Sequence, residues 1–306
     1  MTNTDREISL EGKMDDWGPF GRNEGKWLIF SIGNPLEGHS YALPRNIDDI
    51  FSQRIAHLVS CRTGSRYVAH IPWSTDSADP IARDWAPKFI PVKELAQRLI
   101  NYLKYHLKIY EEMGLPNSRV IIISGHGGND CLTDFTDEIK NALELEKLII
   151  RPAGDLKNDV NFIVKAARSL TMQLAGETGN RREIAKILQT ILLSTGHAGH
   201  MEHSYGAALG ILDVEKLEIM NRELEEDFEG ALNKWPTLGG LGGFLTKGGK
   251  YLEAFGTEDE DPHGLWNCFK ALKELDGGKI KIIKELGDLV IEATVNHYSN
   301  LIKRET

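Results

Sequence analysis

The chain has 306 residues, 41% of them hydrophobic and 26% charged, and its formal net charge is -9. These fractions are typical of a globular protein, and the length suits one large α/β domain or two small ones. The negative charge argues against a nucleic-acid or membrane-surface partner, because either would favour a basic patch. No stretch has the length and apolarity of a transmembrane helix, and no signal-peptide core is recognisable.

Cysteine usage points to a reducing compartment. Cys61, Cys131 and Cys268 are odd in number and widely spaced, so they predict neither a disulfide framework nor a structural zinc site. We therefore expect a cytoplasmic protein. Residues 1–25 are polar and predict an N-terminal arm, and the absence of a repeat or a clean linker predicts a single domain over residues 26–306.

Strand and helix patterns alternate along the chain. Short apolar runs predict strands at 26–32, 67–72, 119–124 and 148–152. Helical spacing predicts helices at 50–61, 92–113 and 132–145, then at 155–193, 205–212 and 279–303, with Asp48 or Asp49 capping the first of them. This order is typical of βαβ units and predicts an α/β fold with a mainly parallel sheet.

A first group of candidate ligands follows the first strand. Glu37 and His39 are two positions apart, so their side chains point the same way in an extended chain, and Asp48 returns after a turn. In an open α/β sheet this edge is where ligands bind. Nitrogen and oxygen donors of this kind suit zinc and manganese, so the group is the beginning of a divalent metal site.

A second group follows the clearest strand. His126 lies between glycines, which allow a sharp turn and leave the imidazole projecting at the edge of the sheet. The alternative is that His126 only caps the next helix. Asn129 either caps that helix or orients a ligand. Elsewhere, His70 lies within a predicted strand and is interpreted as a hydrogen-bonded core histidine.

A third group holds His197, His200, Glu202 and His203 within seven residues. If a helix begins near residue 198, Glu202 and His197 face the same cavity, while His200 and His203 lie on other faces. A polar, solvated helix start is therefore the favoured interpretation for His200 and His203.

Together these three groups resemble the creatininase (creatinine amidohydrolase) family. The first family motif is Glu-x-His, then Leu-Pro, then Asp, and residues 37–48 match it at the family's spacing. The second, His-Gly-Gly-Asn, is residues 126–129, and the third, His-Ala-Gly-x-x-Glu-x-Ser, is residues 197–204. Creatininase itself has His-Tyr-Glu in the second motif, so the chain resembles a different branch, in which Gly128 cannot supply that glutamate.

The resemblance implies a three-layer α/β/α fold that holds two divalent metal ions, with zinc, manganese and iron all acceptable to such ligands. Carried over by position, Glu37 and His126 hold one metal, His39 and Glu202 hold the other, and Asp48 bridges the two. His197 matches the family's catalytic histidine, which donates a proton to the leaving group. Other departures from the family pattern are Ala42, Thr195 and His203. They fall around the substrate pocket and not among the proposed ligands, which implies retained metal chemistry with an altered substrate.

We therefore expect a metal-dependent hydrolase of a small cyclic amide or formamide, in which a metal-bridged hydroxide attacks the carbonyl carbon and a non-peptide C–N bond breaks. One alternative is a hydrolase that opens a cyclic polyol diketone of the inosose type at a C–C bond. Another is a small-molecule-binding protein that kept the scaffold and lost turnover. The resemblance also implies a homo-oligomer, commonly a hexamer, while the net charge and the lack of a transmembrane stretch predict no nucleic-acid or membrane partner.

Overall fold

The fold is built on one parallel sheet. In the computed structural model the described residues are 27–76, 89–151, 198–227, 230–231, 234, 279–280 and 282–305. Among them four strands pair in the order β2-β1-β3-β4, and every neighbouring pair is parallel. They are β1 (Leu28–Ile32), β2 (Arg66–Ile71), β3 (Arg119–Ser124) and β4 (Lys147–Ile150). The predicted parallel sheet is confirmed.

Strand β3 shows why these segments form a buried sheet. Its central residues are all β-branched and none of them is exposed to solvent. Such residues favour strands, and a strand that is covered on both faces reads as a continuous apolar run. Ile121 and Ile123 face one side of the sheet, and Val120 and Ile122 face the other. Each face has its own apolar core.

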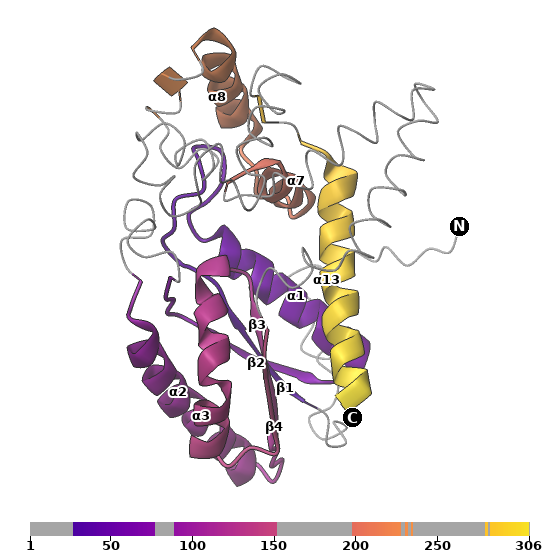
Figure 1. Cartoon of the computed structure of the whole chain (residues 1–306). Coiled ribbons are helices and arrows are strands. Elements are labelled where there is room, and N and C mark those ends of the chain that lie inside the picture. Colours follow the sequence, from indigo (N-terminus) through magenta and orange to yellow (C-terminus); the bar gives the residue numbers. More distant parts are fainter. Residues whose placement is uncertain are drawn as a thin grey trace, which may run out of the picture.

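Helices cover both faces, so the fold is the expected three-layer α/β/α arrangement (Figure 1). On one face lie α1 (Ile47–Thr63) and α13 (Lys284–Glu305). On the other lie α2 (Val92–Glu112) and α3 (Thr136–Ala142). Helix α2 packs through Leu95, Leu99 and Leu103, which recur every four residues and form one apolar stripe.

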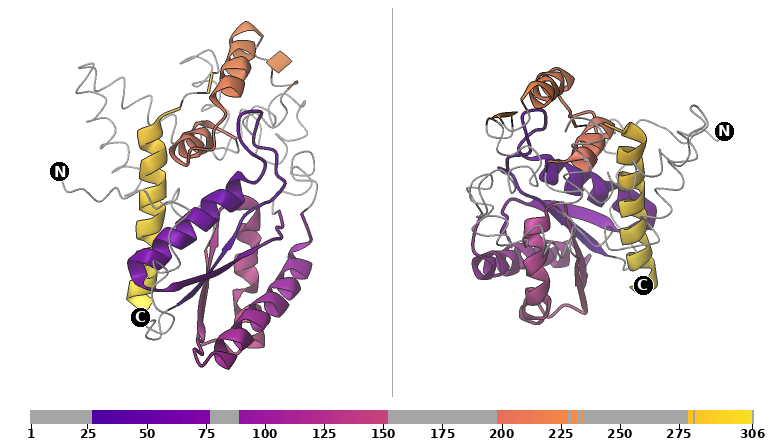
Figure 2. Two further views of the ribbon diagram at one scale, coloured as in Figure 1. Left: turned by 180° about the vertical axis from the view of Figure 1, so that it is seen from behind. Right: turned by 45° about the horizontal axis from the view of Figure 1, so that its top comes forward.

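Two further helices lie beyond the carboxyl ends of the strands. They are α7 (His200–Ala208) and α8 (Val214–Glu226). Helix α7 contacts α13 near the beginning of the latter helix, as Figure 2 shows from two further directions. The third sequence motif thereby comes to the edge of the sheet where the loops after β1 and β3 lie.

The order of the strands marks the position at that edge where open α/β sheets bind ligands. Strand β1 is followed by α1 on one face, whereas its neighbour β3 is followed by the 3-10 helix η3 (Gly127–Phe135) and by α3 on the other. Where neighbouring strands send their connections to opposite faces, a ligand-binding crevice opens outside their carboxyl ends.

The structure corrects several local predictions. The helix predicted at 205–212 is α7 and spans His200–Ala208, and the helix predicted at 279–303 is α13 and begins at Lys284. Helix α1 begins at Ile47 after Asn46, so Asp48 and Asp49 lie in its first turn, and the predicted cap by either of them is wrong. The predicted helix 132–145 is also wrong at its start, because η3 and then α3 occupy residues 127–142.

Several other predictions fall outside the described residues. They are the N-terminal arm 1–25 and the whole of the helix 155–193, and the division into an arm and one domain stays a prediction. Where the chain is described, no helix combines the length and the apolar character that crossing a bilayer requires.

Candidate metal centre

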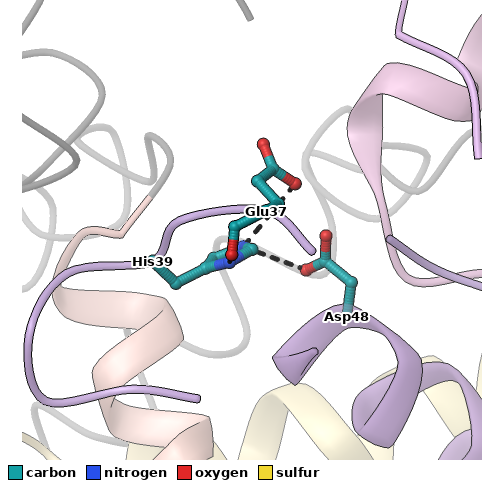
Figure 3. Close-up of side chains that lie close together, drawn as sticks. All are labelled: Glu37, His39 and Asp48. Carbon is teal, nitrogen blue, oxygen red and sulfur yellow. Dashed lines mark hydrogen bonds and ion pairs between the residues drawn. The ribbon is translucent and has the colours of Figure 1, made fainter. Parts of the chain in front are cut away.

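The first predicted group of ligands forms a buried cluster. His39 Nε2 lies 3.2 Å from Asp48 Oδ1 and 3.9 Å from Glu37 Oε2, and all three side chains are at most 3% exposed. Figure 3 shows the three side chains pointing toward one another, with Glu37 and His39 on the loop after β1 and Asp48 on α1. The turn predicted between His39 and Asp48 therefore brings the carboxylate back to the imidazole.

His126 joins this cluster from the neighbouring strand. Its Nδ1 lies 2.8 Å from Glu37 Oε2 and 3.0 Å from Asp48 Oδ2. His126 stands at the N-terminal end of η3 but makes no capping hydrogen bond through its side chain, so the capping alternative is wrong. The loop comes this close to α1 because Gly125 has no side chain, and a Cβ there would collide with the backbone oxygen of Asp48.

Glu202 approaches the cluster from α7. Its Oε2 lies 3.9 Å from His39 Nε2, and the same oxygen accepts a hydrogen bond of 2.5 Å from the backbone N–H of Ala198. Ala198 is buried and has a φ of 52°, a left-handed conformation that is uncommon for a residue with a Cβ. The backbone at Ala198, just before α7, thus turns back to bind the Glu202 carboxylate.

His203 turns out to be fully buried, so the interpretation as part of a solvated helix start is wrong for this residue. Its Nε2 lies 2.9 Å from Ser40 Oγ, and its Nδ1 lies 2.9 Å from the backbone oxygen of Gly199. His203 therefore links the first loop to α7. His197 lies outside the described residues, and so does the side chain of His200.

Asn129 supports the loops around the cluster. Its Nδ2 donates to the backbone oxygen of Gly33 at 2.9 Å, and its Oδ1 accepts from the backbone N–H of Thr75 at 3.0 Å. This amide ties together the loops that follow β1, β2 and β3. It neither caps η3 through a side-chain bond nor projects into the cluster.

Asp76 is a member of the site that the sequence patterns did not single out. It is buried, and its Oδ2 lies 3.3 Å from His126 Nε2. Its position in the sequence could have identified it. Asp76 follows β2 closely, and a parallel sheet brings the loops after all its strands to one edge. Two groups have metal-ligand spacing among the described residues, namely Glu37 with His39 and Asp48, and Glu37 with Asp76 and His126.

A second polar network, mostly buried, lies beside the cluster and begins at Asp49, the residue that follows Asp48. His70 Nε2 lies 3.0 Å from Asp49 Oδ1, and His70 Nδ1 lies 2.8 Å from Ser31 Oγ, which in turn lies 2.8 Å from Tyr67 Oη. His70 is thus hydrogen-bonded through Nδ1, as the sequence predicts, but it is partly exposed and not a core residue. Ser31 is completely buried within β1, so this trio ties α1 to the sheet and does not form an accessible nucleophile.

The charged groups of the cluster strongly shift one another's pKa values. Burial raises the pKa of Glu37 to about 7, although His126 opposes the shift. Burial alone would lower the pKa of His39, but the carboxylates of Asp48, Glu202 and Glu37 outweigh it and raise the pKa to about 10.

The pKa values of Asp48 and His126 shift in the directions expected of an ion pair. Burial acts against the charge of Asp48, yet His39 and His126 hold its pKa well below the usual range. Burial likewise acts against the charge of His126, and Glu37, Asp48 and Asp76 together raise its pKa well above the usual value. Without a metal, the imidazoles carry the positive charge that these carboxylates require.

These donors fit a divalent metal. Carboxylate oxygens and imidazole nitrogens converge from separate elements, they are buried, and their charges compensate one another only if a cation or protons are present. Neutral imidazole and carboxylate donors suit zinc, manganese and iron.

Comparisons with known proteins find sequence relatives at low identity. No family model matches the chain. A 2-amino-5-formylamino-6-ribosylaminopyrimidin-4(3H)-one 5'-monophosphate deformylase of Methanococcus maripaludis is 24% identical over 199 residues, 65% of this chain and 66% of that protein. The deformylase of the same name from Methanothermus fervidus is 24% identical over 214 residues, 70% of this chain and 64% of that protein. The matched part is thus less than two thirds of each relative's length.

Solved structures give the fold. A crystal structure of creatinine amidohydrolase (creatininase) superposes with a TM-score of 0.53 at 14% identity, over 92% of this chain and 91% of that one. A structure described as "Creatininase Mn" matches with the same score, identity and coverage. The chain therefore has the creatininase fold, and the resemblance to the creatininase family that the three motifs predict is confirmed at that level.

Proposed function

We propose that this protein is a dinuclear metal-dependent hydrolase. The observation that carries the proposal is the placement of Asp48 between two imidazoles. Its Oδ1 faces His39 Nε2 at 3.2 Å, and its Oδ2 faces His126 Nδ1 at 3.0 Å. A carboxylate that presents one oxygen to each of two histidines would be able to hold two metal ions between them.

The remaining donors divide between two positions. Glu37 Oε2 lies 2.8 Å from His126 Nδ1, so Glu37, His126 and Asp48 would hold the first metal. Glu202 Oε2 approaches His39 Nε2, so Glu202, His39 and Asp48 would hold the second. This division agrees with the roles that the family resemblance implies.

The chemistry follows from the ligands and their surroundings. When bound at these residues, divalent ions would supply the chemistry of lowering the pKa of a water molecule and polarising a carbonyl group of the substrate. The protein's part is to present neutral imidazoles and ionised carboxylates at fixed positions, and to keep bulk water away through burial. The hydrogen bond from Ala198 to Glu202 orients the Glu202 carboxylate toward His39.

We propose His197 as the proton donor to the leaving group. It directly precedes Ala198, whose N–H binds Glu202, so the sequence joins it to the second metal position. An imidazole with a pKa near neutrality can protonate a departing amine.

The substrate class we propose is a small cyclic amide or formamide, cleaved at a non-peptide C–N bond. It is supported by the similarity to two formylaminopyrimidine deformylases and by the creatininase fold. The metal identity, the hexameric homo-oligomer and the cytoplasmic location stay predictions. Opening of a cyclic polyol diketone remains the alternative reaction, since attack on a ketone uses the same groups.

Metal content tests the proposal first. We expect about two metal ions per chain in the wild-type protein by elemental analysis, and loss of bound metal in Asp48→Asn, because the variant removes the bridging charge. Asp134→Asn is the matched control, since this aspartate lies exposed on η3 and its loss should leave the metal content unchanged. Failure to bind zinc, manganese or iron at all contradicts the proposal.

Product analysis then identifies the bond. The metal-loaded protein would be incubated with N-formylated aminopyrimidines, cyclic amides and cyclic polyol diketones. Release of formate or of an amine supports C–N cleavage, and a ring-opened keto acid supports the alternative. His197→Ala should retain its metal and lose turnover, whereas turnover equal to that of the wild type would remove His197 from the mechanism.

A further inference from the structure

Asp76 is held in place by the loop that carries it. The loop follows β2, and its residues Ser74, Thr75 and Asp76 are all buried. The backbone N–H of Thr75 donates to the Asn129 amide, and the backbone oxygen of Ser74 accepts from the N–H of Ile90 at 2.9 Å. These bonds set the carboxylate of Asp76 beside the imidazole of His126, from a strand that is not adjacent to β3.

The two ring nitrogens of His126 face different partners. Nδ1 faces Glu37 and Asp48, the other proposed ligands of the first metal. Nε2 faces Asp76 Oδ2 at 3.3 Å and Asn34 Nδ2 at 3.5 Å. The side-chain oxygen of Asn34 accepts from the backbone N–H of Leu36, so Asn34 presents only N–H donors to His126. Of these two neighbours, Asp76 is therefore the one that can accept a proton from Nε2.

Gly128 leaves the room that this contact needs. A Cβ at position 128 would collide with His126 Nε2 and would lie 2.7 Å from Asp76 Oδ2. Any other residue at this position would therefore push the carboxylate and the imidazole apart. The second glycine of the motif is explained by the approach of Asp76 to His126.

We propose that Asp76 is a positioning residue that accepts a hydrogen bond from Nε2 of His126 and so directs the lone pair of Nδ1 toward the first metal. The proposal rests on the metal centre described under the proposed function. A histidine that binds a metal through one nitrogen commonly donates its other N–H to a carboxylate, which fixes the tautomer and the ring orientation and makes the imidazole a better ligand.

Metal affinity and a crystal structure test this role. In the full-length protein, zinc affinity would be measured by chelator competition for the wild type, Asp76→Asn, Asp76→Ala and the control Asp134→Asn. We expect a loss of about 10- to 100-fold for both Asp76 variants, with full occupancy regained at excess zinc, and no change for the control. Data collected at the zinc absorption edge should place the metal on Nδ1 of His126, with Asp76 hydrogen-bonded to Nε2.

Two results would overturn the proposal: zinc on Nε2 with an oxygen of Asp76 as a direct ligand, or unchanged zinc affinity in both Asp76 variants. The wild-type crystal structure decides the matter even if the variants fold poorly. In the cobalt-loaded protein, the Nε2 proton of His126 should give an exchangeable NMR signal that moves in Asp76→Asn. If the wild-type protein binds no metal, the proposed function is wrong as well. If it binds zinc with an affinity that the Asp76 substitutions do not change, only the role proposed for Asp76 is wrong.

Discussion

At the residue scale, the cost of burying ionisable side chains is offset by pairing them with groups of opposite charge. Asp48 and His126 are both nearly inaccessible, and each faces more than one oppositely charged partner. In the neighbouring network, His70 lies between the Asp49 carboxylate and the Ser31 hydroxyl. A buried ionisable group that loses its partner costs stability, because the remaining group is neither hydrated nor paired.

We therefore expect His70→Ala to lower the free energy of unfolding by about 3 kcal/mol, because it leaves the Asp49 carboxylate beside an empty space. Tyr67→Phe is the matched control. It removes only the hydroxyl bonded to Ser31 and should cost about 1 kcal/mol. Denaturant unfolding of the metal-loaded protein measures both values. Equal effects of the two substitutions would show that the Asp49 to His70 pair does not stabilise the link between α1 and the sheet.

At the element scale, His203 makes one of the contacts between the loop after β1 and α7. Ser40 has a φ of 83°, which is rare for a residue other than glycine, and its hydroxyl meets His203 Nε2. His39 lies directly before Ser40 and Glu202 directly before His203, so this contact sets the distance between the two donors of the proposed second metal.

His203→Ala should consequently weaken the second metal site and spare the first. Competition with a chelator should show one of the two zinc ions released more readily, by about 10- to 100-fold, while the other is held as in the wild type. His57→Ala, on α1 and outside the metal centre, is the control. Equal weakening of both ions would mean that His203 supports the fold generally and not the second site.

Among the helices and strands, some are predictable from the sequence and others are not. Strand β3 has the bounds that its apolar, β-branched run predicts, and α2 follows its regular leucine spacing closely. The start of α1 and the helix η3 were mispredicted, because their first turns depend on contacts with neighbouring loops and lack a side-chain cap. Asp76 carries no local pattern at all, since its loop reaches His126 only through the tertiary arrangement of β2, β1 and β3.

At the scale of the whole molecule, segments distant in sequence share one site. The loop after β1, the loop after β3 and helix α7 each contribute donors, and the sheet brings the first two to one edge. Helices α1 and α13 fix α7 relative to the sheet. The metal centre therefore couples the stability of the fold to proton and metal binding.

The sign of that coupling follows from two raised pKa values. In the metal-free protein the pKa of His39 rises from 6.5 to about 10, so the stability it contributes is complete below pH 6.5 and is lost as the pH passes 10. For Glu37, raised from 4.5 to about 7, the contribution is complete below pH 4.5 and is lost as the pH passes 7. Metal binding needs both groups deprotonated and so releases their protons.

The metal-loaded protein should accordingly gain in stability over the metal-free protein as the pH rises from about 6 to about 9. Thermal midpoints with and without chelator would measure this gap. Zinc titration calorimetry in buffers of different ionisation enthalpy would count the protons released, and the affinity should rise about tenfold per pH unit for each proton. A gap that stays constant with pH, together with no proton release, would mean that His39 is already neutral in the metal-free protein. The balance of charge in the centre would then have to come from protonated carboxylates.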